Sequence, residues 1–267
     1  MPHVTSADGT RIAYDRKGTG PAVILVGGTL DDGAENAPLA PLLADHFTVY
    51  NYARRGRGAS GNTPPYALAR ELEDLDALIA TAGGSAHLYG ASSGGALALE
   101  AAAAGSAIDK IAVWDVPYVI GDDQWPRFNQ YLADTREADK AGRDEELLEL
   151  FMRLTGGPDA DIATYKQYPF WASSVALAHT LVKDAVILND YKIPTARLAR
   201  ITQPVLVTTE GTTTQPQFAG LPSDFFDRAA KAITAAIPQA ERRTLDGQGH
   251  VVAPELMARV LKTFFNQ

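Results

Sequence analysis

The sequence contains no cysteine among its 267 residues. The chain can therefore form neither a disulfide nor a thiolate metal site, and it has no cysteine nucleophile. Its five histidines are His3, His46, His87, His179 and His250, and they show no paired HxxxH or HxH spacing. No run of carboxylates resembles a calcium loop. We therefore expect no metal ion and no cofactor.

Clustered positive charge is also missing. The formal net charge is -8 and the isoelectric point is near 5.1. The longest basic stretch, Arg54, Arg55 and Arg57, is split by Gly56 and Gly58, which indicates a turn between elements. Such a chain does not attract phosphate backbones or anionic lipid. We expect a small-molecule partner, and neither nucleic acid nor a membrane.

Long apolar runs are absent as well. Nowhere do about 18 apolar residues follow one another, the length that a membrane-spanning helix needs. The first residues, Met1 to Arg16, carry Asp8, Arg11 and Asp15 and lack the apolar stretch of a signal peptide. We therefore expect a soluble, cytoplasmic protein.

The apolar residues that are present, 46% of the chain, are enough for a full core and follow a strand-and-helix pattern. Asp8-Gly9 lies between two short strand-like runs and predicts an opening hairpin. Ala22–Val26 is apolar at every position, as in a strand buried on both faces. Further strands are predicted at 47–52, 87–90, 110–114, 205–209 and 242–245, and helices at 38–44, 66–82, 94–104, 224–237 and 254–265.

This alternation predicts an α/β fold: a doubly wound, mostly parallel central sheet with helices on both faces. Between Val116 and Arg200 the alternation stops, and the segment has helical patterns without a convincing strand. We expect residues 117–200 to form an all-helical lid inserted into a core of residues 1–116 and 201–267. Gly156, Gly157 and Pro158 are predicted to break its helices.

Ser92 is the candidate nucleophile. It lies in the sequence Gly90-Ala-Ser-Ser-Gly94, between a predicted strand and a predicted helix. A serine at such a sharp turn needs small neighbours, which Gly90 and Gly94 supply. The N–H groups of the following helix point toward a developing oxyanion. The spacing differs from the GxGxxG of dinucleotide-binding turns, which favours a nucleophile over phosphate binding.

His250 is the candidate base, because a serine hydroxyl needs one near neutral pH. It follows the last predicted strand in the turn Asp246-Gly-Gln-Gly-His250. Loops at the carboxyl ends of parallel strands converge, so this loop is expected near Ser92. The alternative is a histidine in an ordinary surface loop. His87 and His179 fall within a predicted strand and the predicted lid, where packing or exposure is the expected role.

With these motifs the chain resembles the α/β-hydrolase family, in particular its lidded epoxide-hydrolase-like and esterase-like members. The resemblance extends over the hairpin, Val23 to Thr29, Arg54 to Ser60, the Ser92 turn and the His250 turn. It implies that Thr29 and Ser93 donate backbone N–H groups to the oxyanion and that Gly28 contacts substrate. The chain departs from the family in having Gly27 where histidine is frequent and Ala53 where aspartate is frequent.

The carboxylate that orients the histidine has two candidate positions in this family. One follows the strand 205–209, where Glu210 lies close to the expected place. The other follows the strand 110–114, where Asp115 stands at the strand end. We favour Asp115 over Glu210. Asp115 has an alternative role as a cap at the entry to the lid.

The predicted function is hydrolysis of a carboxylic ester or lactone through an acyl-enzyme on Ser92. Serine at this turn disfavours halide displacement and epoxide opening, which use a carboxylate in related folds. A lyase, a perhydrolase or a C–C bond hydrolase on the same groups, and a non-catalytic receptor, are the alternatives. Aromatic residues of the lid are candidates for the substrate pocket or for packing: Trp125, Tyr168, Phe170 and Trp171.

Overall fold

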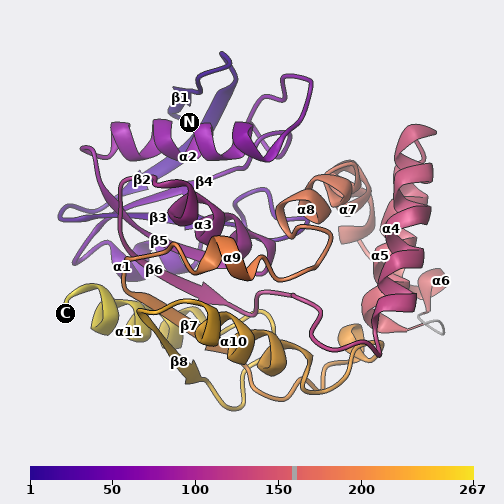
Figure 1. Cartoon of the computed structure of the whole chain (residues 1–267). Helices are drawn as coiled ribbons and strands as arrows, with labels where there is room; N and C mark the ends of the chain where they lie inside the picture. Colours follow the sequence, from indigo (N-terminus) through magenta and orange to yellow (C-terminus); the bar gives the residue numbers. More distant parts are fainter. Residues whose placement is uncertain (158–160) are drawn as a thin grey trace.

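The computed structural model describes residues 1–157 and 161–267 (Figure 1). These residues form an eight-stranded sheet of order β1-β2-β4-β3-β5-β6-β7-β8. The first two strands pair antiparallel, as do β2 and β4, and every later pair is parallel. The strands are β1 His3–Thr5, β2 Arg11–Lys17, β3 Ala22–Val26, β4 Thr48–Tyr52, β5 Ala86–Ala91, β6 Ile108–Trp114, β7 Val205–Thr209 and β8 Ala240–Thr244.

Helices cover both faces of the sheet, as the alternation predicted (Figure 1). Strand β3 shows why its sequence is apolar throughout. Ile24 and Val26 pack into the larger core cluster with α2, α3 and α10, whereas Val23 and Leu25 pack into a second cluster with α1 and α11. The core helices are α1 Leu39–Leu43, α2 Leu68–Thr81, α3 Ser93–Ala104, α10 Phe225–Ala236 and α11 Pro254–Phe265.

Between β6 and β7 the described residues form helices and add no strand to the sheet. We call α4 to α9 the helical insertion. It has a small apolar cluster of its own, which includes Leu147, Trp171 and Leu181, and Phe128 joins it to the main core. Its helices are α4 Trp125–Lys140, α5 Asp144–Gly156, α6 Ile162–Tyr165, α7 Phe170–Ala178, α8 Leu181–Ile187 and α9 Thr195–Leu198.

The predicted helix break falls at the end of α5. This helix ends at Gly156, and Gly157 follows with a φ angle of 95°, a value that glycine adopts without strain. Pro158 lies outside the described residues. The boundaries of a separate lid at 117 and 200 stay a prediction.

The last strand differs most from its predicted range. It was predicted at 242–245, but β8 spans Ala240–Thr244 and pairs along its whole length with β7. As the edge of the sheet it is partly exposed and carries Glu241, Arg242 and Arg243. Charged residues suit an exposed edge, and they remove the hydrophobic alternation by which a strand is recognised.

No helix in the described part of the chain is long and apolar enough to cross a membrane.

Candidate active site

Ser92 sits in a strained turn between β5 and α3. Its φ and ψ angles are 52° and -123°, in a region that side-chain-bearing residues rarely adopt. Its N–H donates to the Trp114 carbonyl of β6 at 2.7 Å. A Cβ atom on Gly90 would lie 2.4 Å from the Gly94 carbonyl oxygen, so the turn closes only without a side chain there. The GxSxG spacing thus has a direct steric reason.

The start of α3 packs directly against the loop after β3. A Cβ atom on Gly94 would lie 2.3 Å from the Val26 carbonyl oxygen. This approach brings Thr29 beside Ser93, and the Thr29 hydroxyl donates to Ser93 Oγ at 3.2 Å. Within the described part of the chain, neither the Thr29 N–H nor the Ser93 N–H donates to a protein acceptor. The two candidate oxyanion donors are therefore neighbours with free N–H groups.

The unusual Gly27 also has a structural reason. A Cβ atom at this position would lie 2.0 Å from Oδ2 of Asp31. Asp31 is buried, and its Oδ1 accepts the N–H groups of Gly33 and Glu35 at 2.9 and 3.0 Å. The Asp31 side chain occupies the space beside the loop, so a side chain at position 27 would require Asp31 to move.

Asp115 is the carboxylate in contact with His250. Its Oδ2 lies 3.3 Å from His250 Nδ1, and the residue is 1% exposed. Its Oδ1 accepts the N–H of Glu210 at 3.1 Å, and its own N–H donates to the Thr208 carbonyl at 3.1 Å. Asp115 has a φ angle of 45°, which aspartate tolerates better than most residues. The end of β7 therefore holds Asp115 by its backbone N–H and by its carboxylate.

Glu210, the other candidate, contributes its backbone rather than its carboxylate to this arrangement. The side chain is buried, and its Oε1 has no hydrogen-bond partner among the described residues. Burial, and then the charge of Asp115, raise the pKa of Glu210 above its ordinary value. The structure thus brings Asp115, and not Glu210, into contact with the imidazole.

The imidazole of His250 is held from several directions. Trp114 Nε1 donates to the His250 carbonyl at 2.7 Å. The ring stacks on Phe226 and meets Phe218 edge-on, with ring centres 4.8 Å apart in both cases. Burial alone would lower the pKa of His250, but the hydrogen bond and charge of Asp115, followed by Glu35 and Glu210, raise it above its ordinary value. The arrangement favours the imidazolium that forms when the ring accepts a proton.

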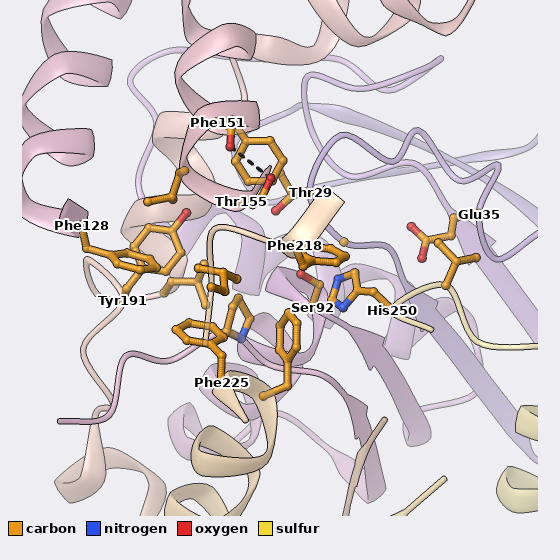
Figure 2. A pocket seen from close by; sticks show the side chains of 17 residues that line it. Thr29, Glu35, Ser92, Phe128, Phe151, Thr155, Tyr191, Phe218, Phe225 and His250 are labelled. Carbon is orange, nitrogen blue, oxygen red and sulfur yellow. Dashed lines mark hydrogen bonds between the residues drawn. The ribbon is translucent and has the colours of Figure 1, made fainter. Parts of the chain in front are cut away.

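A cavity of about 220 Å³ opens over these groups. Figure 2 shows Ser92 and His250 side by side, with aromatic side chains gathered on one side and Glu35 on the other. No lysine or arginine is among the described residues that line it. The predicted Gly28 and Thr29 lie in its wall. The other lining residues come from the segment between β6 and β7 and from the segments after β7 and β8: Pro117, Phe128, Phe151, Leu154, Thr155, Leu188, Tyr191, Phe218, Leu221, Phe225, Phe226 and Val251.

The four aromatic residues proposed from the sequence for this pocket lie elsewhere. Trp125 packs at the edge of the main core, with Lys192 Nζ over its ring. Tyr168 and Phe170 stack on each other and are 51% and 46% exposed. Trp171 is buried inside the insertion, and its Nε1 donates to Glu145 Oε1 at 3.2 Å. None of the four is among the described lining residues.

The aromatic lining that sequence reasoning missed comes from two places. Phe128 lies on α4 one turn after Trp125, so the rotation of that helix decides which ring faces the cavity. Phe218, Phe225 and Phe226 follow β7, at the edge where Glu210 stands. The sequence carried one signal for these three residues. They follow a parallel strand, and the loops after parallel strands converge at the edge of the sheet where the site lies.

No cluster of three histidine, aspartate or glutamate side chains suited to hold a metal ion occurs in residues 1–157 and 161–267.

The family model of the alpha/beta hydrolase family matches residues 8–262. The chain therefore belongs to the α/β hydrolase family, as the sequence motifs predicted. An α/β hydrolase from Sphaerobacter thermophilus is 42% identical, with 99% of this chain and 100% of that chain covered and a TM-score of 0.81.

More distant relatives share the fold. An esterase from a Rhodococcus species is 20% identical, with 100% and 98% of the two chains covered and a TM-score of 0.71. The enol-lactonase from Burkholderia xenovorans is 19% identical, with both chains fully covered (100%) and a TM-score of 0.70. Among curated proteins, "Probable oxidoreductase EphD" of Mycobacterium tuberculosis is 40% identical over 81 residues. That stretch spans 28% of this chain and only 14% of the relative.

The close packing at the elbow predicts a large cost for Gly94→Ala. A methyl group there must displace the backbone after β3, and overpacking of this kind costs about 3 kcal/mol or more of unfolding free energy. Gly142→Ala is the control, because Gly142 has a φ angle of +66° but nothing within 4 Å. It should lose only about 1 to 2 kcal/mol through backbone strain. Urea unfolding measures both, and equal losses would contradict the steric argument.

The surroundings of His250 predict its titration. We expect NMR of the imidazole Cε1–H to give a pKa above 6.5 in the wild type. Asp115→Asn should lower this pKa, because burial, which favours the neutral ring, is then opposed only by Glu35 and Glu210. Glu210→Gln should lower it less. A larger fall in Glu210→Gln than in Asp115→Asn would reverse the assignment of the orienting carboxylate.

Proposed function

We propose that this α/β hydrolase cleaves carboxylic esters or lactones of small molecules through an acyl-enzyme on Ser92. The observation that carries the proposal is the meeting of three features in one place. These are a serine in a strained turn at the start of a helix, an imidazole hydrogen-bonded to a buried carboxylate, and an apolar cavity over both. Acyl transfer by a serine needs this combination of nucleophile, oriented base and enclosed substrate site.

In the proposed reaction Ser92 Oγ attacks the ester carbonyl while His250 accepts the hydroxyl proton. The N–H groups of Thr29 and Ser93 hold the negative oxygen of the tetrahedral intermediate. The intermediate collapses, the bond to the alcohol oxygen breaks, and the imidazolium of His250 returns its proton to that oxygen. Water, deprotonated by His250, then attacks the acyl-enzyme, and the acid leaves as Ser92 regains its proton.

Asp115 orients the imidazole in this scheme and stabilises its cation. The contact at 3.3 Å and the raised pKa of His250 support that role. Glu210 acts through its backbone N–H, which holds Asp115 Oδ1.

The helical insertion serves as the lid over the nucleophile in this proposal, within residues 117–200. Phe128 and Phe151 from α4 and α5 form part of the cavity wall. The small volume and aromatic lining suit a short or aromatic acyl group. The lack of a cationic side chain among the described lining residues, together with Glu35, favours an uncharged substrate.

The assigned nucleophile and base predict the effect of removing them. Ser92→Ala and His250→Ala should each lower kcat for p-nitrophenyl butyrate by about 10³-fold or more. Ser92→Ala should also lose labelling by a fluorophosphonate probe. Ser173→Ala and His46→Ala are matched controls on the exposed surface and should retain activity. A wild-type protein that neither labels nor turns over would instead favour the receptor alternative.

The electrostatics of the cavity predict a preference for neutral esters. No lysine or arginine among the described lining residues compensates a substrate carboxylate beside Glu35, and one like charge at about 4 Å costs about 1 to 4 kcal/mol. At pH 8, kcat/KM for p-nitrophenyl butyrate should exceed that for mono-p-nitrophenyl succinate by at least about tenfold, after division by the uncatalysed rates. Glu35→Gln should narrow the ratio, and Glu241→Gln on the exposed edge strand should leave it unchanged. A preference for the succinate would contradict the proposed substrate class.

A further inference from the structure

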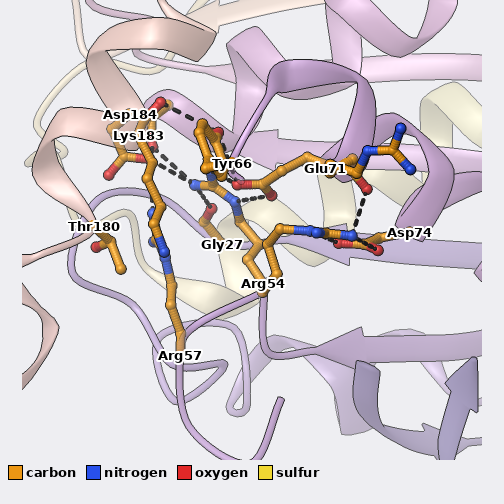
Figure 3. A network of polar contacts seen from close by, with 12 residues as sticks. Gly27, Arg54, Arg57, Tyr66, Glu71, Asp74, Thr180, Lys183 and Asp184 are labelled. Carbon is orange, nitrogen blue, oxygen red and sulfur yellow. Dashed lines mark hydrogen bonds and ion pairs between the residues drawn. The ribbon is translucent and has the colours of Figure 1, made fainter. Parts of the chain in front are cut away.

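Asp184 on α8 reaches from the helical insertion to Arg54 and Arg57 of the core (Figure 3). The residue is 1% exposed. Its Oδ1 accepts three hydrogen bonds: from Arg57 Nη2 at 2.7 Å, from Arg54 Nη1 at 2.9 Å and from Ser93 Oγ at 3.2 Å. A single carboxylate oxygen therefore connects the insertion to the loop after β4 and to the first residue of α3.

Arg57 connects this carboxylate to one of the two candidate oxyanion donors. Its Nη1 donates to the Gly28 carbonyl oxygen and, at 3.4 Å, to the Asp31 carbonyl oxygen. The Gly28 carbonyl and the Thr29 N–H belong to the same planar peptide group, in which they point in opposite directions. A guanidinium that holds this carbonyl therefore sets the direction of the Thr29 N–H.

Arg54 and Ser93 connect Asp184 to the other donor. Arg54 Nη1 donates to Ser93 Oγ at 3.2 Å and to the Gly27 carbonyl at 3.4 Å. Since Ser93 Oγ also donates to Asp184, the side chain of the residue that carries the second N–H is held on two sides. Both candidate oxyanion donors thus depend on contacts that meet at Asp184.

The two arginines differ in how far they depend on Asp184. Arg54 also forms a two-pronged pair with Glu71, at 3.0 and 2.9 Å. Among the ion pairs of the described residues, Arg57 has Asp184 as its only carboxylate partner. Arg57 is almost fully buried, and a buried charge without its partner is costly enough to change position. Loss of the Asp184 charge would therefore release Arg57 from its place against Gly28.

We propose that Asp184 is a positioning residue for the oxyanion hole. It acts through Arg57 on the Thr29 N–H, and through Arg54 and its direct contact on Ser93. The insertion then supplies part of the catalytic geometry in addition to covering the substrate. This inference rests on the acyl-transfer function proposed above, in which Thr29 and Ser93 bind the oxyanion.

The test is Asp184→Asn, which keeps the size of the side chain and removes its charge. Fluorophosphonate titration counts the active sites that react. Dividing the rate by this number gives kcat per site, which a loss of folded protein does not change. We expect kcat per site for p-nitrophenyl butyrate to fall about 10- to 100-fold, with KM changed less than about 3-fold. Complete removal of one oxyanion donor lowers kcat by about 10²- to 10³-fold, and a displaced donor should cost less. The Ki of a trifluoromethyl ketone, whose adduct with Ser92 carries an oxyanion, should rise by the same factor as kcat/KM falls.

Asp74→Asn is the matched control. Asp74 is the buried carboxylate partner of Arg55, at 2.6 Å, and touches neither Ser93 nor the loop after β3. It should lower the melting temperature while leaving kcat per site and the ketone Ki unchanged. Asp184→Glu, which keeps the charge, should recover part of the lost kcat.

If Asp184→Asn does not fold, Arg57→Lys is measured in its place, because a single ammonium cannot span both Asp184 and the Gly28 carbonyl. An unchanged ketone Ki and kcat per site in the folded variant would overturn the role of Asp184. A wild-type protein that is neither labelled nor active would instead overturn the acyl-transfer function on which the inference rests.

Discussion

The backbone of the turn after β5 lies in direct contact with the backbone after β3, with no side chain between them. Gly94 permits this contact, since a Cβ atom there would overlap the Val26 carbonyl oxygen, and Gly90 lets the turn itself close, since a Cβ atom there would overlap the Gly94 carbonyl oxygen. At this junction Ser92 has its strained conformation and Ser93 lies beside Thr29. The other features of the candidate site are arranged around this junction, because it fixes where the Ser92 hydroxyl and the N–H groups of Thr29 and Ser93 lie, between which the proposed reaction places the substrate carbonyl.

A second constraint is the burial of charge beside the junction. Arg54 and Arg57 are each about 1% exposed, and leaving either without an acceptor would cost several kcal/mol. Both arginines donate to carboxylates and to carbonyl groups of the loop after β3, so that neither charge is left without an acceptor (Figure 3). The network joins the loop after β3 to carboxylates on α2 and α8. It also ties α8 to the core, while α4 and α5 contribute residues to the cavity wall.

The charged side chains that act on His250 are carboxylates. Asp115, Glu35 and Glu210 all act to raise its pKa, and the described lining residues include no lysine or arginine. In the proposed acyl transfer these carboxylates stabilise the imidazolium, and they make an anionic substrate less favourable than a neutral one. The aromatic rings of Phe218 and Phe226 hold the imidazole in place without adding charge.

The sequence by itself determined the fold class and the family, because both are local signals: a buried strand is apolar throughout, and the elbow needs glycine on each side of Ser92. It also placed Asp115 and His250 at strand ends, where convergence is a property of parallel sheets.

The choice between Asp115 and Glu210 needed the structure, since both follow neighbouring strands and only their backbone geometry decides which carboxylate reaches the imidazole. Composition does not give the rotation of a helix in the insertion, which decides that Phe128 lines the cavity whereas Trp125 is not among its described lining residues. The contact of Asp184 with Arg57 joins residues 127 positions apart, and only the packing of the insertion onto the core brings them together.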